Sequence, residues 1–338
     1  MQGAGRPRGG HIGGRPLPAR PRRGVAMSYS VLTDAQKLAF RCDGYLVVKA
    51  ALSHAEVRDL EFVADGLMKR HSPQGQGSGL EKHETQVQLR RPIAETPELL
   101  PLVGNGSTVS LCAQLLSPNI HLHTAAVLFK FPHACAPEER QAQFELLSAG
   151  WHRDIGITED MGHEHVFRAG IKVCYALTDF QSPMSGLTRF ARGSHLLRTP
   201  LPVDRGGRPT THVAVQPPLC RGDAVLFENR IFHCGSVNMQ PRVAKSLILG
   251  YAYRWMGGHK ANMDLVWPRD QALLAGLPPR TQQLLGAEGD GLVAWCRDHG
   301  FVRGERGDAF AWVTKTSAQA DGRAAAVVAA AAVAAAKL

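Results

Sequence analysis

The chain has 338 residues, of which 44% are hydrophobic, and a formal net charge of +10. This length and apolar content allow a substantial buried core and exclude a wholly disordered or membrane-embedded chain. Six arginines precede Met27, in a stretch that lacks Asp and Glu, and account for six of the ten charges. The other basic residues form no run interleaved with aromatic residues, so we expect no nucleic-acid partner.

Seven cysteines are scattered without a C-x-x-C pair, as is typical of reduced thiols in an intracellular protein. No apolar run reaches the roughly 18 to 20 residues that a membrane-spanning helix needs. The chain also lacks the charged start and apolar core of a signal peptide. We therefore expect a cytoplasmic protein without a membrane span, whose oligomeric state the sequence does not indicate.

Both ends have a biased composition. Residues 1–26 are rich in Gly, Pro and Arg, which predicts a disordered basic leader, and residues 319–338 are an Ala-rich tail. Between them, residues 27–318 are expected to form a single domain. The tail ends in Ala336, Lys337 and Leu338, which resemble the terminal tripeptide read by the peroxisomal import receptor. A peroxisomal location is thus the alternative to the cytoplasm.

The folded part opens with helix signals. Thr33 with Gln36 forms a capping box, and Gly44 is placed to end that helix. A short β-like run at 45–48 follows. A second capping box begins at Ser53, and apolar residues then recur at helical spacing up to a loop at 71–79.

From about residue 121 the pattern changes to short β-rich runs separated by turn residues, without long helices between them. Such a pattern favours an antiparallel sandwich or jelly roll over a doubly wound sheet. The fold class expected is therefore mainly β with flanking helices. The predicted strands are 121–131, 171–180, 211–216, 223–228 and 246–254.

The first chemical motif is the sequence Gly-Trp-His-Arg-Asp at 150–154. On an extended segment, His152 and Asp154 project to the same face, so an imidazole and a carboxylate can reach one ion. One further histidine would complete the two-His, one-carboxylate set that suits non-haem Fe(II). His163 with His165, and His121 with His123, are competing pairs, but neither has a convincing third ligand.

The second motif spans residues 222–242, where a Gly-Asp turn and an apolar run lead to His233, Asn238 and Arg242. A histidine that ends one strand and an arginine that starts the next can line one pocket. The arginine can then fork onto a carboxylate, as a dicarboxylate co-substrate requires.

With these motifs, residues 33–255 resemble the phytanoyl-CoA dioxygenase family of Fe(II)- and 2-oxoglutarate-dependent oxygenases. The resemblance also includes Gly44-Tyr45, Lys130-Phe131-Pro132, the segment 185–190 and Gly193-Ser194-His195. It departs from the family pattern at Thr188-Arg189, where a proline-containing turn is usual, and in the slightly short interval between His233 and Arg242.

The resemblance implies a double-stranded β-helix, a cupin-like jelly roll, with a core at about 121–255. It implies His152, Asp154 and His233 as the metal ligands. Arg242 would bind the distal carboxylate of 2-oxoglutarate, with hydrogen bonds from Ser236 and Lys130.

Fe(II) would be the cofactor, with 2-oxoglutarate and O₂ as co-substrates. Because Asp154 occupies a ligand position, hydroxylation of a small organic substrate is expected rather than halogenation. That substrate could be acyl-CoA-like, amino-acid-like or a secondary metabolite. The alternatives are a non-catalytic cupin-like binding protein and a cupin-type metal enzyme without a co-substrate.

Overall fold

A computed structural model describes residues 29–71, 80–83, 85–256, 271–303 and 312–314. The two predicted chain ends and the terminal tripeptide lie outside these residues, as does nearly all of the predicted loop at 71–79. Among the described residues, no helix has the length and hydropathy to cross a bilayer.

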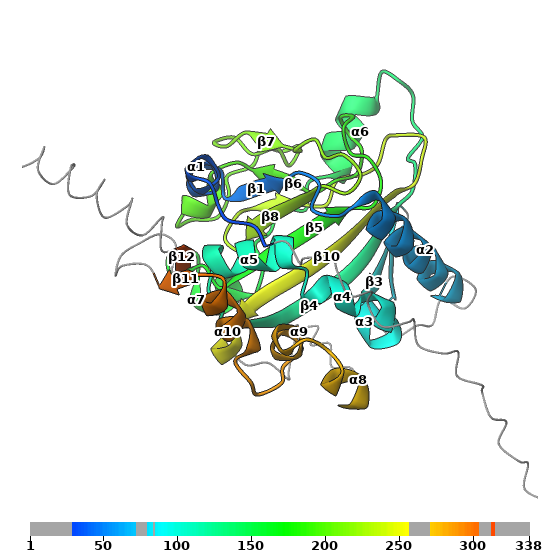
Figure 1. Ribbon diagram of the computed structural model, residues 1–338. Coiled ribbons are helices and arrows are strands. Elements are labelled where there is room, and N and C mark those ends of the chain that lie inside the picture. The colour runs from blue at the N-terminus through cyan, green and yellow to red at the C-terminus, as the bar shows by residue number, and fades with distance from the viewer. Residues whose placement is uncertain (1–28, 72–79, 84, 257–270, 304–311, 315–338) are drawn as a thin grey trace, which may run out of the picture.

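A seven-stranded antiparallel sheet forms the centre of the molecule (Figure 1). Its strands, in spatial order, are β1 (Tyr45–Val48), β8 (Ala224–Glu228), β5 (Gly170–Ala176), β10 (Ala244–Tyr253), β4 (Ile120–Lys130), β3 (Gln86–Arg90) and β2 (Leu80–His83). Four of the five strands predicted from the β-rich region correspond to members of this sheet, namely β4, β5, β8 and β10. The fifth, predicted at 211–216, is shorter and belongs to a second sheet. The predicted strand 171–180 ends early at Ala176, and beyond it Phe180 pairs with Leu219 in an isolated bridge.

A smaller sheet of three strands packs against one face of the large one. It consists of β7 (Ala214–Val215), β6 (Arg189–Ala191) and β9 (His233–Cys234). Aromatic side chains fill the space between the sheets: Phe190 of β6 lies 5.0 Å from Phe227 of β8, measured between ring centroids. The two facing antiparallel sheets make the expected jelly roll.

Helices cover the other face of the large sheet (Figure 1). Those before β4 are α1 (Asp34–Asp43), α2 (His54–His71), α3 (Pro92–Glu95), α4 (Leu100–Val103) and α5 (Gly106–Leu115), with a 3-10 turn η1 (Pro97–Leu99). The predicted capping boxes at Thr33 and Ser53 are both formed. Apolar residues of α2 and α5, such as Leu60 and Val109, join Val127 and Leu247 of the sheet in one buried core.

The remaining elements were not located by sequence patterns. They are α6 (Arg140–Leu147), α7 (Ile157–Met161), η2 (Ser194–Leu196), η3 (Arg254–Met256), α8 (Gln271–Ala275), α9 (Pro279–Leu284), α10 (Gly291–Asp298), β11 (Phe301–Arg303) and β12 (Trp312–Thr314). Buried Leu284 and Leu292 tie α9 and α10 to the main core, so this part of the C-terminal region belongs to the same packed unit.

Side chains of the large sheet alternate between its two faces. On β3, Val87 and Leu89 are buried with the helical core, whereas Gln86, Gln88 and Arg90 face the other way. Gln86 is opposite Lys130 of β4, and Lys130 is opposite Ala244 of β10. The face that meets the small sheet therefore carries polar side chains at this end.

Candidate metal centre

The segment that contains His152 and Asp154 is held against β9 by the backbone. The N–H of His152 donates to the carbonyl of His233 at 2.9 Å, and the N–H of His233 donates to the carbonyl of His152 at 3.0 Å. The N–H of Asp154 donates to the carbonyl of Asn229 at 3.0 Å. This pairing fixes the register between the two sequence motifs, although they are far apart in the chain.

The pairing brings the three predicted metal ligands together. One possible donor atom from each of His152, Asp154 and His233 lies within 4.8 Å of the others. The two imidazole centroids are 4.3 Å apart, and Nε2 of His233 is 3.3 Å from Oδ2 of Asp154. Within the described residues, no other group of three His, Cys, Asp or Glu side chains gathers in this way.

Hydrogen bonds select the nitrogen that each histidine can offer to a metal. Nδ1 of His152 lies 2.9 Å from the carbonyl of Gly150, and Nδ1 of His233 lies 3.0 Å from the carbonyl of Ile231. Since a carbonyl only accepts, Nδ1 carries the proton in both rings and Nε2 keeps a free lone pair. Burial lowers the pKa of His233 to about 3, against the opposing effect of the Asp154 carboxylate, so its ring is neutral.

A cation is needed to make this arrangement favourable. The lone pair of His233 Nε2 faces Oδ2 of Asp154, which is buried and has no hydrogen-bond partner. Burial favours the neutral acid, but the ammonium of Lys172, 2.7 Å from Oδ1, holds the pKa of Asp154 well below its usual range. Two electron-rich atoms facing each other repel unless an ion lies between them. The donor set therefore fits Fe(II).

Arg153 anchors the segment from the opposite side. Its guanidinium donates to the carbonyls of Arg230, Ser194 and Leu197 at 2.7 to 3.0 Å and lies 4.2 Å from the ring centroid of Phe232. Because the guanidinium binds three backbone carbonyls, the backbone between the two ligands cannot rotate freely.

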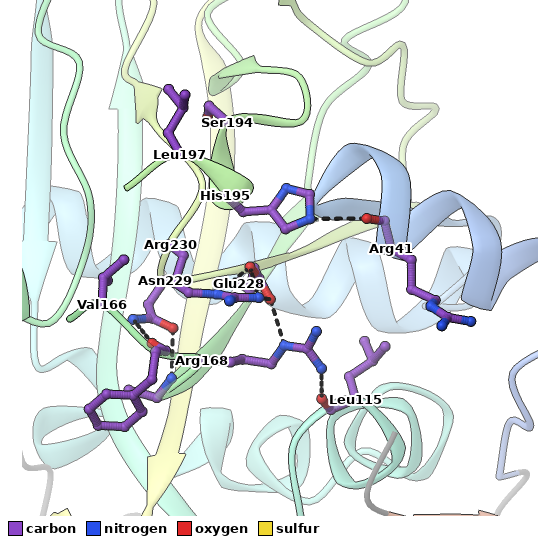
Figure 2. Close-up of polar contacts among 12 residues, drawn as sticks. Arg41, Leu115, Val166, Arg168, Ser194, His195, Leu197, Glu228, Asn229 and Arg230 are labelled. Atoms are coloured by element: carbon purple, nitrogen blue, oxygen red, sulfur yellow. Dashed lines mark hydrogen bonds and ion pairs between the residues drawn. The ribbon is translucent and has the colours of Figure 1, made fainter. Parts of the chain in front are cut away.

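A buried ion cluster supports the same region (Figure 2). Glu228 is fully buried, and its carboxylate pairs with Arg168 at 2.5 Å and with Arg230 at 2.7 Å. Next to it, the side chain of Asn229 accepts from the backbone that leads into β5, while its own carbonyl holds Asp154. The turn between β8 and β9 thus positions both Asp154, through Asn229, and His233, which begins β9.

Lys130 and Ser236 lie together between the sheets. Nζ of Lys130 donates to the carbonyl of Ser236 at 2.7 Å, and the hydroxyl of Ser236 donates to the carbonyl of Leu187 and accepts from Gln216. Burial lowers the pKa of Lys130 to about 8. No carboxylate within the described residues forms an ion pair with Lys130. The ammonium of Lys130 thus contacts the backbone just after His233.

Arg242 lies elsewhere. Its guanidinium donates to the carbonyl of Asp179 at 3.0 Å and its side chain is 55% exposed. It lines an open pocket of about 640 Å³ beside α2, together with Glu61 and Lys245. The structure therefore does not bring Arg242 to the three metal ligands. The interval between His233 and Arg242 is short, so Arg242 lies in the turn before β10. Ala244, the first residue of β10, occupies the inward position opposite Lys130.

The competing histidine pairs have other surroundings. Nδ1 of His163 is 2.8 Å from the guanidinium of Arg153, and His165 is 63% exposed beside Glu164. His121 and His123 are buried on β4. His123 lines a cavity of about 10 Å³ that Asp154 and Lys172 also line, so it lies near the metal centre without joining the cluster.

Sequence reasoning missed Lys172 and Gln216. Lys172 is an isolated lysine inside the apolar run of β5, with buried neighbours on both sides. A charge in such a run costs energy unless it is paired, and this signal was available in the sequence. Gln216 follows a very short strand and has no comparable signal.

Comparison with known protein families identifies the family of this chain. A family model described as phytanoyl-CoA dioxygenase (PhyH) matches residues 40–244, more than half of the sequence. The chain belongs to the phytanoyl-CoA dioxygenase family. This result confirms the family and the dioxygenase class expected from the sequence, and the His-Asp-His centre fits the expected iron and 2-oxoglutarate.

The chain is also similar to solved structures. EctD from S. alaskensis, crystallised with 2-oxoglutarate and 5-hydroxyectoine, is 20% identical with a TM-score of 0.50, over 69% of this chain and 82% of that one. AviO1 from Streptomyces viridochromogenes is 19% identical with a TM-score of 0.49, over 67% and 96% of the two chains. The likeness to EctD bears on the fold alone.

Among curated proteins, the chain is 29% identical over 147 residues to the uncharacterized protein YJR154W of Saccharomyces cerevisiae. The match covers 40% of this chain and 39% of that protein. The name of this yeast protein indicates no substrate.

Proposed function

We propose that the protein is an Fe(II)- and 2-oxoglutarate-dependent dioxygenase that hydroxylates a small organic substrate. The observation that carries the proposal is the convergence of His152, Asp154 and His233 on one point. Both histidines turn Nδ1 toward backbone carbonyls, and a buried oxygen of Asp154 lacks a hydrogen-bond partner. Three protein ligands on one side of an iron leave room for a chelating co-substrate and O₂.

Bound iron, with 2-oxoglutarate and O₂, would supply the oxidising chemistry: of the two atoms of O₂, one would go to the succinate formed with CO₂ and the other to a C–H bond of the substrate. The chain supplies position and shielding. His233 is 4% exposed and lies against Phe227, with ring centroids 4.9 Å apart, so one side of the centre is closed to water. His152 is exposed and marks the open side.

Lys130 is the residue proposed to hold the distal carboxylate of 2-oxoglutarate, in place of Arg242. Its buried ammonium contacts the chain just after His233, whereas the guanidinium of Arg242 is engaged by Asp179. An ammonium in a low-dielectric site gains more from a carboxylate than it would in water. Ser236 would redirect its O–H from Leu187 to the same carboxylate.

The substrate class is proposed from the wall next to Lys130. Gln86, Gln88 and Arg90 of β3 face the side on which Lys130 lies, and all three are partly exposed. Amide and guanidinium groups hydrogen-bond polar oxygens better than they line an apolar groove. We therefore propose a polar small molecule rather than a long aliphatic chain.

The test is succinate release from purified, iron-loaded protein supplied with 2-oxoglutarate and O₂, with Asp154→Ala as the matched control. The proposal expects succinate from the unaltered protein and none above background from the variant. Only background succinate from both proteins would contradict the proposal and favour a non-catalytic binding protein.

A further inference from the structure

Lys172 has a neighbour without a side chain on the adjacent strand. It lies on β5 directly opposite Gly250 of β10. A Cβ at Gly250 would lie 3.4 Å from Cγ of Lys172 and 2.4 Å from Cγ2 of Thr124. A side chain at Gly250 would therefore clash with Thr124 and touch the stem of Lys172. Without a side chain, Gly250 leaves room beside the stem of Lys172, whose ammonium contacts Asp154.

The contact of Lys172 with Asp154 divides the two carboxylate oxygens. Nζ of Lys172 is 2.7 Å from Oδ1, whereas Oδ2 faces Nε2 of His233 at 3.3 Å. Side-chain exposures of 24% for the lysine and 12% for the aspartate show that water competes little for this pair. One oxygen is thus committed to the ammonium, and the other is free for an ion.

We infer that Lys172 is a positioning residue that limits Asp154 to binding the metal through one oxygen, Oδ2. This inference rests on the proposed function, because it needs an ion at the centre. A carboxylate can bind a metal through one oxygen or both, and two-oxygen binding would use a further coordination position. By occupying Oδ1, Lys172 keeps that position available to the co-substrate or O₂.

Removal of the ammonium has two consequences. The buried carboxylate of Asp154 loses the positive charge beside it. Its side chain also loses the hydrogen bond to Oδ1, so only the metal would then hold its orientation. Loss of a hydrogen-bond partner that orients a metal ligand typically weakens metal binding about 10- to 100-fold. The mode of binding should also change, because both oxygens then become available.

The experiment is an anaerobic titration with Co(II), a spectroscopic stand-in for Fe(II), followed by its visible d–d absorption. It uses Lys172→Met, Lys172→Arg and the control Lys245→Met. Lys245 is also a partly buried sheet lysine, and it pairs with Glu61 and Asp65 on the face away from the metal. The thermal midpoint of each metal-free protein reports folding, and Lys172→Gln replaces the Met variant if that variant does not fold.

The inference expects Lys172→Met to bind Co(II) at least about tenfold more weakly, with an altered band. Lys172→Arg, which still donates to Oδ1, should restore the band, and Lys245→Met should match the unaltered protein. An unchanged affinity and band in Lys172→Met would overturn the inference alone. If the unaltered protein binds no Co(II), the proposed function falls as well, so the two failures are distinguishable.

Discussion

His152 and His233 exchange two backbone hydrogen bonds, of 2.9 and 3.0 Å, and their rings lie 4.3 Å apart. This reciprocal pair joins the two halves of the metal centre in one register. A slip of one residue would turn either side chain to the opposite face and dismantle the site. The metal centre is therefore a consequence of strand pairing as much as of the residues themselves.

The histidine pair leads to a prediction about metal binding. His233→Ala removes a buried ligand whose Nε2 has no other use, so Fe(II) affinity should fall by at least about 100-fold. His165→Ala is the matched control, because His165 is 63% exposed and outside the cluster. Equilibrium dialysis against Fe(II) under anaerobic conditions measures both. Equal loss in the two variants would show that the His152, Asp154 and His233 cluster is not the metal site.

The proposed roles of Lys130 and Arg242 can be separated by two matched variants. Lys130→Met should raise the Kd for 2-oxoglutarate at least about tenfold, because hydrogen bonds between charged groups are worth about 1.5 to 3 kcal/mol. Arg242→Met should leave the Kd unchanged, since its side chain is 55% exposed and paired with Asp179. Isothermal titration of the metal-loaded proteins gives both constants. The reverse pattern would restore Arg242 as the anchor.

Binding of 2-oxoglutarate should also depend on pH through Lys130. Burial lowers the pKa of Lys130 to about 8 in the protein without co-substrate. Below this pH the ammonium is charged and attracts the carboxylate; above it the amine is neutral and the attraction is lost. The Kd should therefore rise as the pH increases from 7 to 9.

Lys130→Arg provides the control for this pH dependence. Its guanidinium stays protonated well above the range of the titration, because the pKa of arginine is far higher than that of lysine. The rise in Kd between pH 7 and 9 should therefore disappear in this variant. A similar rise in both proteins would assign the pH dependence to another group.

Much of the fold could be predicted from the sequence, because its signals are local. The capping boxes at Thr33 and Ser53 predicted where α1 and α2 begin, and short β-rich runs between turn residues predicted β4, β8 and β10. Strands β3 and β6 were not predicted, since neither contains a continuous apolar run like that of β8. Helices α8 to α10 follow no motif of the family.

The site was predictable only where a motif marked it. His152, Asp154 and His233 have characteristic neighbours and spacing. The place of Arg242 depends on how many residues the turn before β10 consumes, and that number decides which residue faces inward. Lys172 acts through a partner on another segment, so only the three-dimensional arrangement identifies its role.

The buried ion cluster behind the metal centre allows a stability prediction. Glu228→Gln leaves Arg168 and Arg230 without their shared carboxylate in a buried setting, which should lower the free energy of unfolding by about 3 to 5 kcal/mol. Asp34→Asn is the control, because Asp34 is 90% exposed and its pair with Lys37 contributes at most about 1 kcal/mol. Urea unfolding at pH 7 measures both. Similar small losses would show that the cluster contributes little.

The central claim is that one ferrous ion is shared by His152, Asp154 and His233 and chelated by 2-oxoglutarate. Anaerobic titration of the purified protein with Fe(II) and 2-oxoglutarate tests it most directly, through the weak visible charge-transfer band of that chelate. The account predicts a band that saturates at one Fe(II) and one 2-oxoglutarate per chain and is absent in Asp154→Ala. No band in the unaltered protein, or an equal band in the variant, would contradict it.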